Sequence, residues 1–347
     1  MAGAAGALAA TAMRTSQALA TTEVMANRTA GSPTAEVAAM QNDPLPSWND
    51  GPNKQTILDF VAAVTEEGGD RFVPEADRIA TFDNDGTLWT EQPIYTQGYF
   101  TFDQIKTLAP QHPEWQTEQP YAAILAGDVE AMKQFSEEDI GKLMAAAHTG
   151  MTTDEFDEQA RAWVTTAKHP TYDHLFTECV YQPQLELLAY LRANGFQTFI
   201  VSGGGIDLIR AFSAETYGIP PNRVIGSSAE VTYSLENGVA TLTKQPEVNS
   251  GDDKEDKPIN IRLHIGQKPI LAFGNSDGDQ PMLEYTDTGD GPRLMLIVHH
   301  DDGAREVAYD RPSAIGQLDA AWDEAVEKGW NVVSMKDDWN RIFPFEG

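Results

Sequence analysis

The sequence is poor in cysteine and in basic residues. Cys179 is the only cysteine among 347 residues, so this sequence forms no internal disulfide and no cysteine metal cluster. We expect Cys179 to be buried as a small apolar residue. Lysine and arginine number 24 against 53 acidic residues, which leaves a formal net charge of −29. That charge repels phosphate backbones and anionic membrane faces, so we expect neither nucleic acid nor an anionic membrane as partner.

The sequence also lacks a run of eighteen apolar residues, so we expect no membrane span. Residues 1–50 are rich in small and polar residues and are interpreted as a leader or flexible linker. The segment 18–20, Ala-Leu-Ala, is similar to the end of an export signal, although no basic segment precedes it. Export to the periplasm or exterior and a cytoplasmic location both remain open.

The most informative stretch is Asp83-Asn84-Asp85-Gly86-Thr87, which follows the short apolar run 79–82. If that run is a strand, Asp83 leaves its carboxyl end, where open α/β sheets place their ligands. Two neighbouring acids can divide one task, one ionised as nucleophile and metal ligand, the other carrying a proton. The alternative is an ordinary turn, since Asp, Asn and Gly are common turn residues.

This stretch resembles the first motif of the haloacid dehalogenase-like superfamily in its phosphatase form. Three later features resemble the family's other motifs in the same order: Val201-Ser202-Gly203-Gly204, Lys257, and the stretch from Gly274 to Asp279. The branch that the chain resembles is the phosphoserine phosphatase-like one. The resemblance implies an α/β fold with a Rossmann-like parallel sheet core, residues 51–89 and 181–347, and an inserted all-helical cap, residues 90–180.

The resemblance also implies roles for the two acids. Asp83 is the expected nucleophile, and Asp85 the expected general acid and then base. The implied cofactor is Mg²⁺, bound by Asp83, by the main-chain carbonyl of Asp85 and by a side chain of the fourth motif. Most members have Asp where this chain has Asn275, and their second acid corresponds to Asp279. Asp277 is a further alternative.

Phosphate binding is expected from Thr87, Ser202, the amide near Gly203, and Lys257, which is preferred over Lys254 and Lys244. Trp89 and Glu91 follow residues 83–87, which we call the catalytic turn, and are candidates for substrate specificity. In phosphoserine phosphatases a glutamate near this place meets the substrate's ammonium group. A glutamate facing water at the start of the cap is the alternative for Glu91.

The predicted function is a Mg²⁺-dependent phosphomonoester hydrolase that acts through an aspartyl-phosphate intermediate. Its substrate would be a small phosphorylated metabolite, phosphoserine-like or another small organic phosphate. The alternatives are a phosphomutase or phosphotransferase of the same fold, or a catalytically silent binding protein. The sequence leaves the oligomeric state open.

Local patterns predict several elements. Ser136 with Asp139, and Thr152 with Glu155, are typical of capping boxes at helix starts. Residues 224–244 are predicted to form a hairpin that turns at Asn237-Gly238. Further helices are expected from Asn53, Pro183 and Ile206, and further strands at 197–201, 270–273, 294–298 and 331–334. We expect His299 and His300 to end a strand at the surface.

Overall fold

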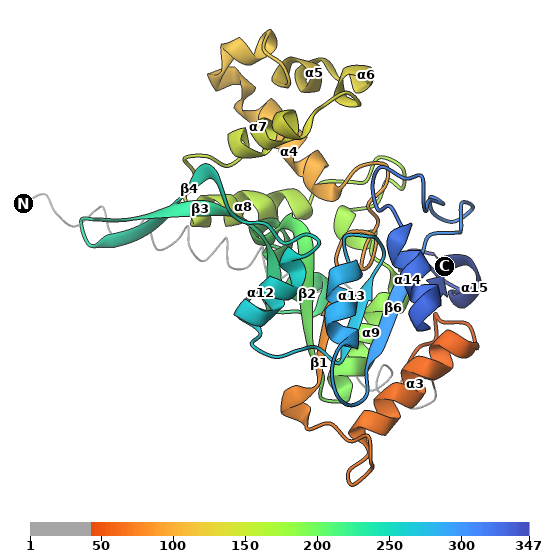
Figure 1. Ribbon diagram of the computed structural model, residues 1–347. Helices are drawn as coiled ribbons and strands as arrows, with labels where there is room; N and C mark the ends of the chain where they lie inside the picture. Colours follow the sequence, from red (N-terminus) through yellow and green to blue (C-terminus); the bar gives the residue numbers. More distant parts are fainter. Residues whose placement is uncertain (1–42, 347) are drawn as a thin grey trace, which may run out of the picture. The chain divides into compact units, whose positions relative to one another are not determined.

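Seven strands form one sheet in the part of the chain that the computed structural model describes, residues 43–346 (Figure 1). The strand order is β4-β3-β2-β1-β5-β6-β7, and every neighbouring pair is parallel except β3 and β4. The predicted α/β class with a mostly parallel sheet is therefore confirmed. The strands are β1 (Ile79–Phe82), β2 (Gln197–Gly205), β3 (Val224–Glu236), β4 (Val239–Ser250), β5 (Leu271–Gly274), β6 (Leu294–His299) and β7 (Asn331–Ser334).

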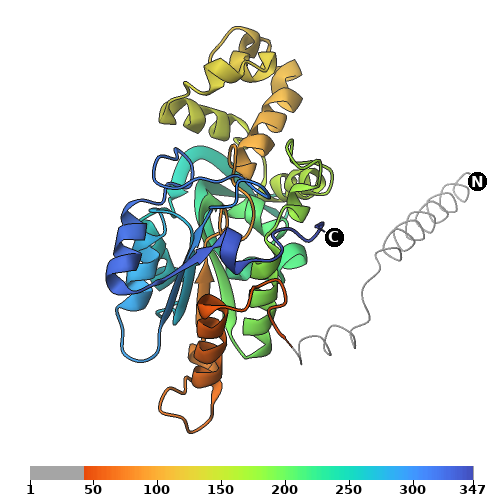
Figure 2. The same ribbon diagram turned by 90° about the vertical axis from the view of Figure 1, so that its right-hand side faces the viewer.

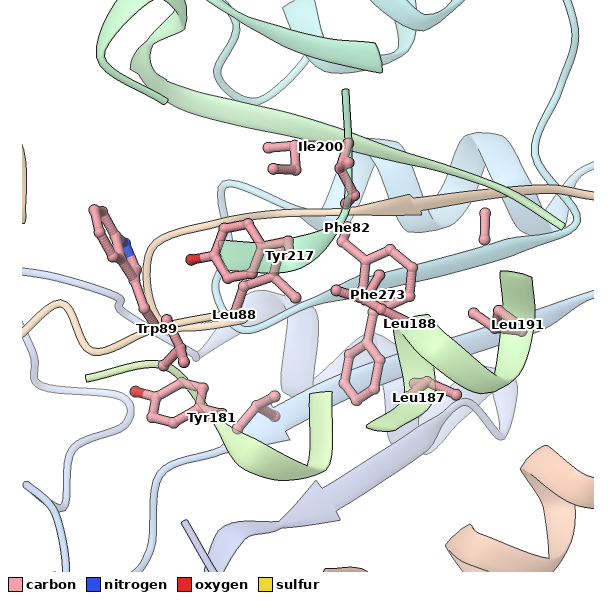
Figure 3. Packing of buried hydrophobic residues seen from close by; sticks show 14 of the residues in the cluster. Phe82, Leu88, Trp89, Tyr181, Leu187, Leu188, Leu191, Ile200, Tyr217 and Phe273 are labelled. Carbon is pink, nitrogen blue, oxygen red and sulfur yellow. The ribbon is translucent and has the colours of Figure 1, made fainter. Parts of the chain in front are cut away.

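Helices cover both faces of this sheet because successive side chains of a strand point to opposite sides. Phe82, Ile200 and Phe273 point to one face, where they pack with Leu187 and Leu191 (Figure 3). Val201 and Ala272 point to the other face and share a second apolar cluster. The helices of the first face include α3 (Pro52–Thr65) and α9 (Gln182–Ala193), and those of the second include α12 (Asp256–His264), α13 (Gln280–Asp287) and α14 (Ala320–Lys328).

The segment between β1 and α9 is helical and carries an apolar cluster of its own. Ile105, Trp115, Ile124 and Leu143 are buried together in this cluster. Figures 1 and 2 show its helices grouped beyond the ends of the strands. They are α4 (Thr96–Leu108), α5 (Tyr121–Ala126), α6 (Val129–Met132) and α7 (Glu137–Ala146), followed by α8 (Thr153–Val164), which packs in the main core. We call residues 90–180 the helical insertion.

Two helices of the insertion begin where the sequence predicts. Ser136 and Asp139 form a capping box at α7, and Thr152 and Glu155 form one at α8. Each box satisfies backbone N–H groups that the first turn of a helix leaves without partners. Both predicted starts are confirmed.

The predicted hairpin is also present and is longer than expected. Asn237 and Gly238 both have positive φ, 52° and 82°, as the two-residue turn requires. The pairing continues to Ser250, with register shifts between Ser228 and Val231. The middle of β4 lies against the insertion, since Lys244 exchanges backbone hydrogen bonds with Gly150 and Met151.

Other boundaries differ from the predictions. Helix α3 begins after Gly51, and Asn53 is no cap, because its side-chain amide donates to Val332 O and Asp338. The helix expected over 206–217 is two short helices, α10 (Ile206–Arg210) and α11 (Ser213–Tyr217). The last element, α15 (Met335–Asp338), follows β7 directly.

The segment 1–42, with the predicted export signal and most of the predicted linker, lies outside the described residues. Leu45 and Trp48 are buried in the main apolar cluster, a few residues before the expected boundary at residue 51. Cys179 is fully buried, as expected. Within residues 43–346, no helix is long and apolar enough to span a membrane.

Candidate active site

The predicted site residues meet where three adjacent parallel strands end. Asp83 follows β1, the central strand of this group, and its N–H donates to Phe273 O at 2.9 Å. Ser202 lies in the last part of β2, and Asn275 follows β5 directly. Because the carboxyl ends of parallel strands share one edge of a sheet, residues nearly 200 positions apart become neighbours here.

Lys257 joins the first and fourth motifs through an ion-pair cluster. Its Nζ lies 2.7 Å from Asp83 Oδ1, 2.6 Å from Asp279 Oδ1 and 3.0 Å from Val201 O. Burial would lower the pKa of Lys257, but the carboxylates of Asp279 and Asp83 raise it above its ordinary value. Lys257 therefore stays charged. The alternatives lie elsewhere: Lys254 is exposed, and Lys244 pairs with Asp207.

The two acids of the catalytic turn have different surroundings. Burial raises the pKa of Asp83, as do the carboxylates of Asp279 and Asp85, and the ion pair with Lys257 opposes this rise. Asp85 accepts a hydrogen bond from Trp89 Nε1 at 2.8 Å, and burial raises its pKa to about 6. A carboxyl group with that pKa exchanges protons readily near neutral pH.

Asn275 is held between the catalytic turn and Glu91. Its Nδ2 donates to Glu91 Oε1 at 2.8 Å, and its Oδ1 accepts from Thr87 Oγ1 at 3.1 Å. The approach is close enough to require a glycine at position 86, since a Cβ there would overlap both Asn275 and Glu91. The hydroxyl of Tyr309 also donates to Glu91 Oε1, at 2.7 Å.

The acids of the fourth motif do different things. Asp279 Oδ2 accepts from the backbone N–H groups of Asn275 and Ser276, at 2.9 and 3.1 Å, so it shapes the loop after β5. Asp277 accepts from the N–H groups of Asp319 and Ala321 at the start of α14. Asp277 is thus used in fixing a helix end.

A cavity of about 550 Å³ opens from this edge of the sheet towards the helical insertion. Of the predicted residues, it is lined by Asp83, Asp85, Glu91, Ser202, Gly203 and Lys257. Thr87 and Trp89 are buried and face Asn275 and Asp85 instead. Trp89 also stacks on Phe212, with ring centroids 4.6 Å apart. The assigned roles of these residues remain predictions.

Sequence reasoning missed two residues that support the turn. His300 is buried, and its Nε2 donates to Gly86 O at 2.8 Å, so the prediction that it lies at the surface is wrong. Its ring stacks on Tyr309, with centroids 4.3 Å apart. Both residues lie more than 200 positions from the catalytic turn, and no local pattern marks either of them.

The oxygen atoms at this edge fit a hard divalent cation such as Mg²⁺. The available donors are the Asp83 carboxylate, the main-chain carbonyl of Asp85 and the amide oxygen of Asn275, which packs directly against the turn. Among residues 43–346, no three His, Cys, Asp or Glu side chains form a group that could hold a metal ion. A cation here would therefore depend on carbonyl and amide oxygens as well as carboxylates.

The fold and the site together define a class: α/β proteins with paired carboxylates at the carboxyl end of a central parallel strand. The family is shown by the match of a family model, haloacid dehalogenase-like hydrolase, to residues 80–284, more than half of the chain. The chain belongs to this family and is a hydrolase of this class.

Several solved structures are similar to this chain at low sequence identity. A conserved functionally unknown protein from Anaerococcus prevotii is similar with a TM-score of 0.50 and 15% identity over 81% of this chain and 91% of that chain. At this identity the likeness shows the fold alone. A protein with unknown function from Bordetella pertussis has a TM-score of 0.45 and 14% identity, covering 74% of this chain and 97% of that chain. A probable phosphoserine phosphatase from Vibrio cholerae has a TM-score of 0.35 and 15% identity, covering 77% and 71%. No curated protein matches this chain.

Proposed function

We propose that the protein is a Mg²⁺-dependent phosphomonoester hydrolase that forms an aspartyl-phosphate on Asp83. The observation that supports this proposal is the difference between the surroundings of Asp83 and those of Asp85. Asp83 forms an ion pair with the ammonium group of Lys257, whereas Asp85 accepts a hydrogen bond from the indole N–H of Trp89 and has a pKa of about 6. The first arrangement favours a carboxylate that attacks, and the second favours a group that gives and takes a proton.

The chain's own residues account for the two steps of such a reaction. The Asp83 carboxylate attacks phosphorus while the proton of Asp85 passes to the leaving alcohol oxygen, which departs as the alcohol. Asp85 then accepts a proton from the water that attacks the aspartyl-phosphate, and inorganic phosphate leaves. Ser202, the amide near Gly203 and Lys257 line the cavity beside Asp83 and would hold the phosphate oxygens.

A bound Mg²⁺ would add positive charge beside the phosphate and the Asp83 carboxylate. Its proposed ligands are Asp83, the main-chain carbonyl of Asp85, and Asn275 or Asp279. The neutral amide of Asn275 contributes a dipole and no charge, so its share of metal binding is smaller than that of a carboxylate.

We further propose that the helical insertion acts as a cap. It carries its own apolar cluster, and it supplies part of the wall of the cavity that contains Asp83 and Asp85. A cap over these acids excludes water during attack on phosphorus and selects the leaving group by shape.

Phosphate release from p-nitrophenyl phosphate tests the proposal. We expect turnover with Mg²⁺, loss of turnover in EDTA and recovery when Mg²⁺ is added in excess. Asp83→Asn should abolish turnover, because an amide does not attack phosphorus. Full activity in EDTA would contradict the metal requirement. Inactivity towards every phosphoester would contradict the hydrolase, and transfer of phosphate to an added alcohol would identify a phosphotransferase.

A further inference from the structure

The part of the cavity wall that the helical insertion forms is mainly apolar. Large apolar side chains from the helices of the insertion and the loop between α6 and α7 line it, namely Phe102 of α4, Met132 of α6, Phe135, and Ile140, Leu143 and Met144 of α7. Ile94, before α4, and Ile315, from the loop that precedes α14, complete this wall. A leaving group that rises from the phosphate towards the insertion therefore meets hydrocarbon surface.

The ionisable side chains that face the cavity are almost all acidic. Asp83, Asp85, Glu91 and Asp253 contribute carboxyl groups, and Lys257 is the sole basic residue in the lining that the structure describes. The three donors of its ammonium group are matched by Asp83, Asp279 and Val201 O. In the proposed function Lys257 serves the phosphate group and Asp83, so it is not the partner of a carboxylate on the leaving group.

Two lysines of the insertion helices do not supply a cationic partner for such a carboxylate either. Lys133, which follows α6, pairs with Glu130 at 2.8 Å, and Lys142 on α7 pairs with Glu138 at 2.7 Å. Both lysines are exposed and neither lines the cavity. A substrate carboxylate would enter a site whose described lining offers acidic side chains and no basic residue besides Lys257, which is unfavourable.

We infer that the cavity takes phosphomonoesters of uncharged, apolar alcohols, such as aryl or medium-chain alkyl phosphates, and disfavours carboxylated ones such as phosphoserine. This inference rests on the proposed function. Glu91 Oε1 is engaged by Asn275 and Tyr309, so only its Oε2 remains for a substrate ammonium group. Selectivity comes from apolar contact with the insertion and from the absence of a partner for a carboxylate.

The test compares n-alkyl phosphates from propyl to octyl, together with phenyl phosphate, 4-carboxyphenyl phosphate, phosphoethanolamine and phosphoserine. We expect kcat/KM to rise about fourfold for each methylene that enters the cavity. We expect phenyl phosphate to exceed its carboxylated partner by at least about tenfold. A flat chain-length series, or a preference for phosphoserine or phosphoethanolamine, would overturn the inference and leave a phosphatase.

Two matched variants test which side chains cause the dependence of kcat/KM on chain length. Phe135→Ser should flatten the chain-length dependence, because it removes apolar wall without touching the acids. Val129→Ser is the control, since Val129 is 58% exposed on the neighbouring helix α6 and does not line the cavity. An equal effect of both substitutions would assign the dependence to stability of the insertion, against the inference.

A binding measurement separates this inference from the proposed function. Calorimetry with n-alkylphosphonates, which carry no hydrolysable ester, should show affinity that rises about fourfold per methylene. 2-Amino-4-phosphonobutanoate, the carboxylated counterpart, should bind no better than methylphosphonate. If every ester resists hydrolysis while this series holds, the proposed hydrolase is wrong and the cavity inference stands. An unchanging affinity along the series overturns the cavity inference.

Discussion

At the residue scale, the carboxyl group of Asp85 accepts a hydrogen bond from the indole N–H of Trp89. Asp85→Asn keeps the main-chain carbonyl and removes the proton donor and acceptor. With an aryl phosphate, whose leaving group needs little protonation, the first step should suffer less than the second. Phosphorylated protein should then accumulate and appear as a burst or as added mass after acid quench. Steady-state turnover should fall about 10²–10⁴-fold.

Asp83→Asn is the matched control for this experiment. It should give neither turnover nor added mass, because the attacking group is gone. Normal steady-state hydrolysis of alkyl phosphates by Asp85→Asn would remove Asp85 from the mechanism.

The amide of Asn275 is explained by its neighbour Glu91. A carboxylate at position 275 would face the buried Glu91 carboxylate across the present 2.8 Å contact. Asn275→Asp should therefore lower the free energy of unfolding by about 1–3 kcal/mol in metal-free protein. The double variant N275D/E91Q restores an amide–carboxylate hydrogen bond with the roles exchanged, and it should regain much of that loss.

Thermal unfolding of the two single variants and the double variant in EDTA measures this coupling without any activity. We expect an interaction energy of about 0.5–3 kcal/mol. Additive changes in the free energy of unfolding would show that the side chains of Asn275 and Glu91 do not interact.

At the scale of elements, α8 ties the helical insertion to the main core. Its start is fixed by the Thr152–Glu155 capping box, and Phe156, Ala160 and Trp163 are buried on its inner face. Thr152→Ala removes the hydroxyl that accepts from the backbone N–H of Glu155, so the free energy of unfolding should fall by about 0.5–2 kcal/mol. Denaturant unfolding measures this change.

Thr165→Ala provides a matched control at the other end of the same helix. Thr165 is exposed, and its hydroxyl donates only to carbonyls of the last turn, which water can also satisfy. The control should change stability by less than about 0.5 kcal/mol. A comparable loss of stability in both variants would show that the Thr152–Glu155 capping box contributes no more than the hydroxyl of Thr165.

At the scale of the whole molecule, the net charge of −29 and buried carboxyl groups act in the same direction. Burial raises the folded-state pKa of Asp85 and of Asp252 to about 6, above the ordinary value of 3.8. When folding raises the pKa of an acid, the acid does not lower the free energy of unfolding at pH values below its unfolded pKa. The full destabilisation is present at pH values above its folded pKa. Metal-free protein should therefore become less stable as the pH rises from about 4 to 6.

Melting temperatures in EDTA at pH 5 and pH 7 check this expectation. Each pKa unit is worth about 1.4 kcal/mol, so the higher pH should be less stable by a few kcal/mol. Asp252→Asn, at a fully buried position, should reduce the difference. A melting temperature that rises from pH 5 to pH 7 would contradict the prediction.

The sequence by itself determined the local elements. Capping boxes at Ser136 and Thr152, the turn at Asn237-Gly238 and the apolar run 79–82 each depend on neighbours within a few positions. Such signals act through backbone hydrogen bonds and side-chain periodicity, which are legible along the chain. The resemblance of the spaced motifs to a known family then predicted the parallel α/β fold, which is confirmed, and the roles of Asp83 and Asp85, which remain predictions.

Only the tertiary structure decided how distant residues meet. Lys257 reaches Asp83 across 174 positions, Asn275 reaches Glu91 across 184, and His300 reaches Gly86 across 214. The apolar wall of the cavity likewise combines helices of the insertion with the loop around Ile315. These contacts depend on which strands are neighbours in the sheet and on how loops at one edge pack together. Neither leaves a local pattern, because the burial and pairing of each side chain are set by segments far away in the sequence.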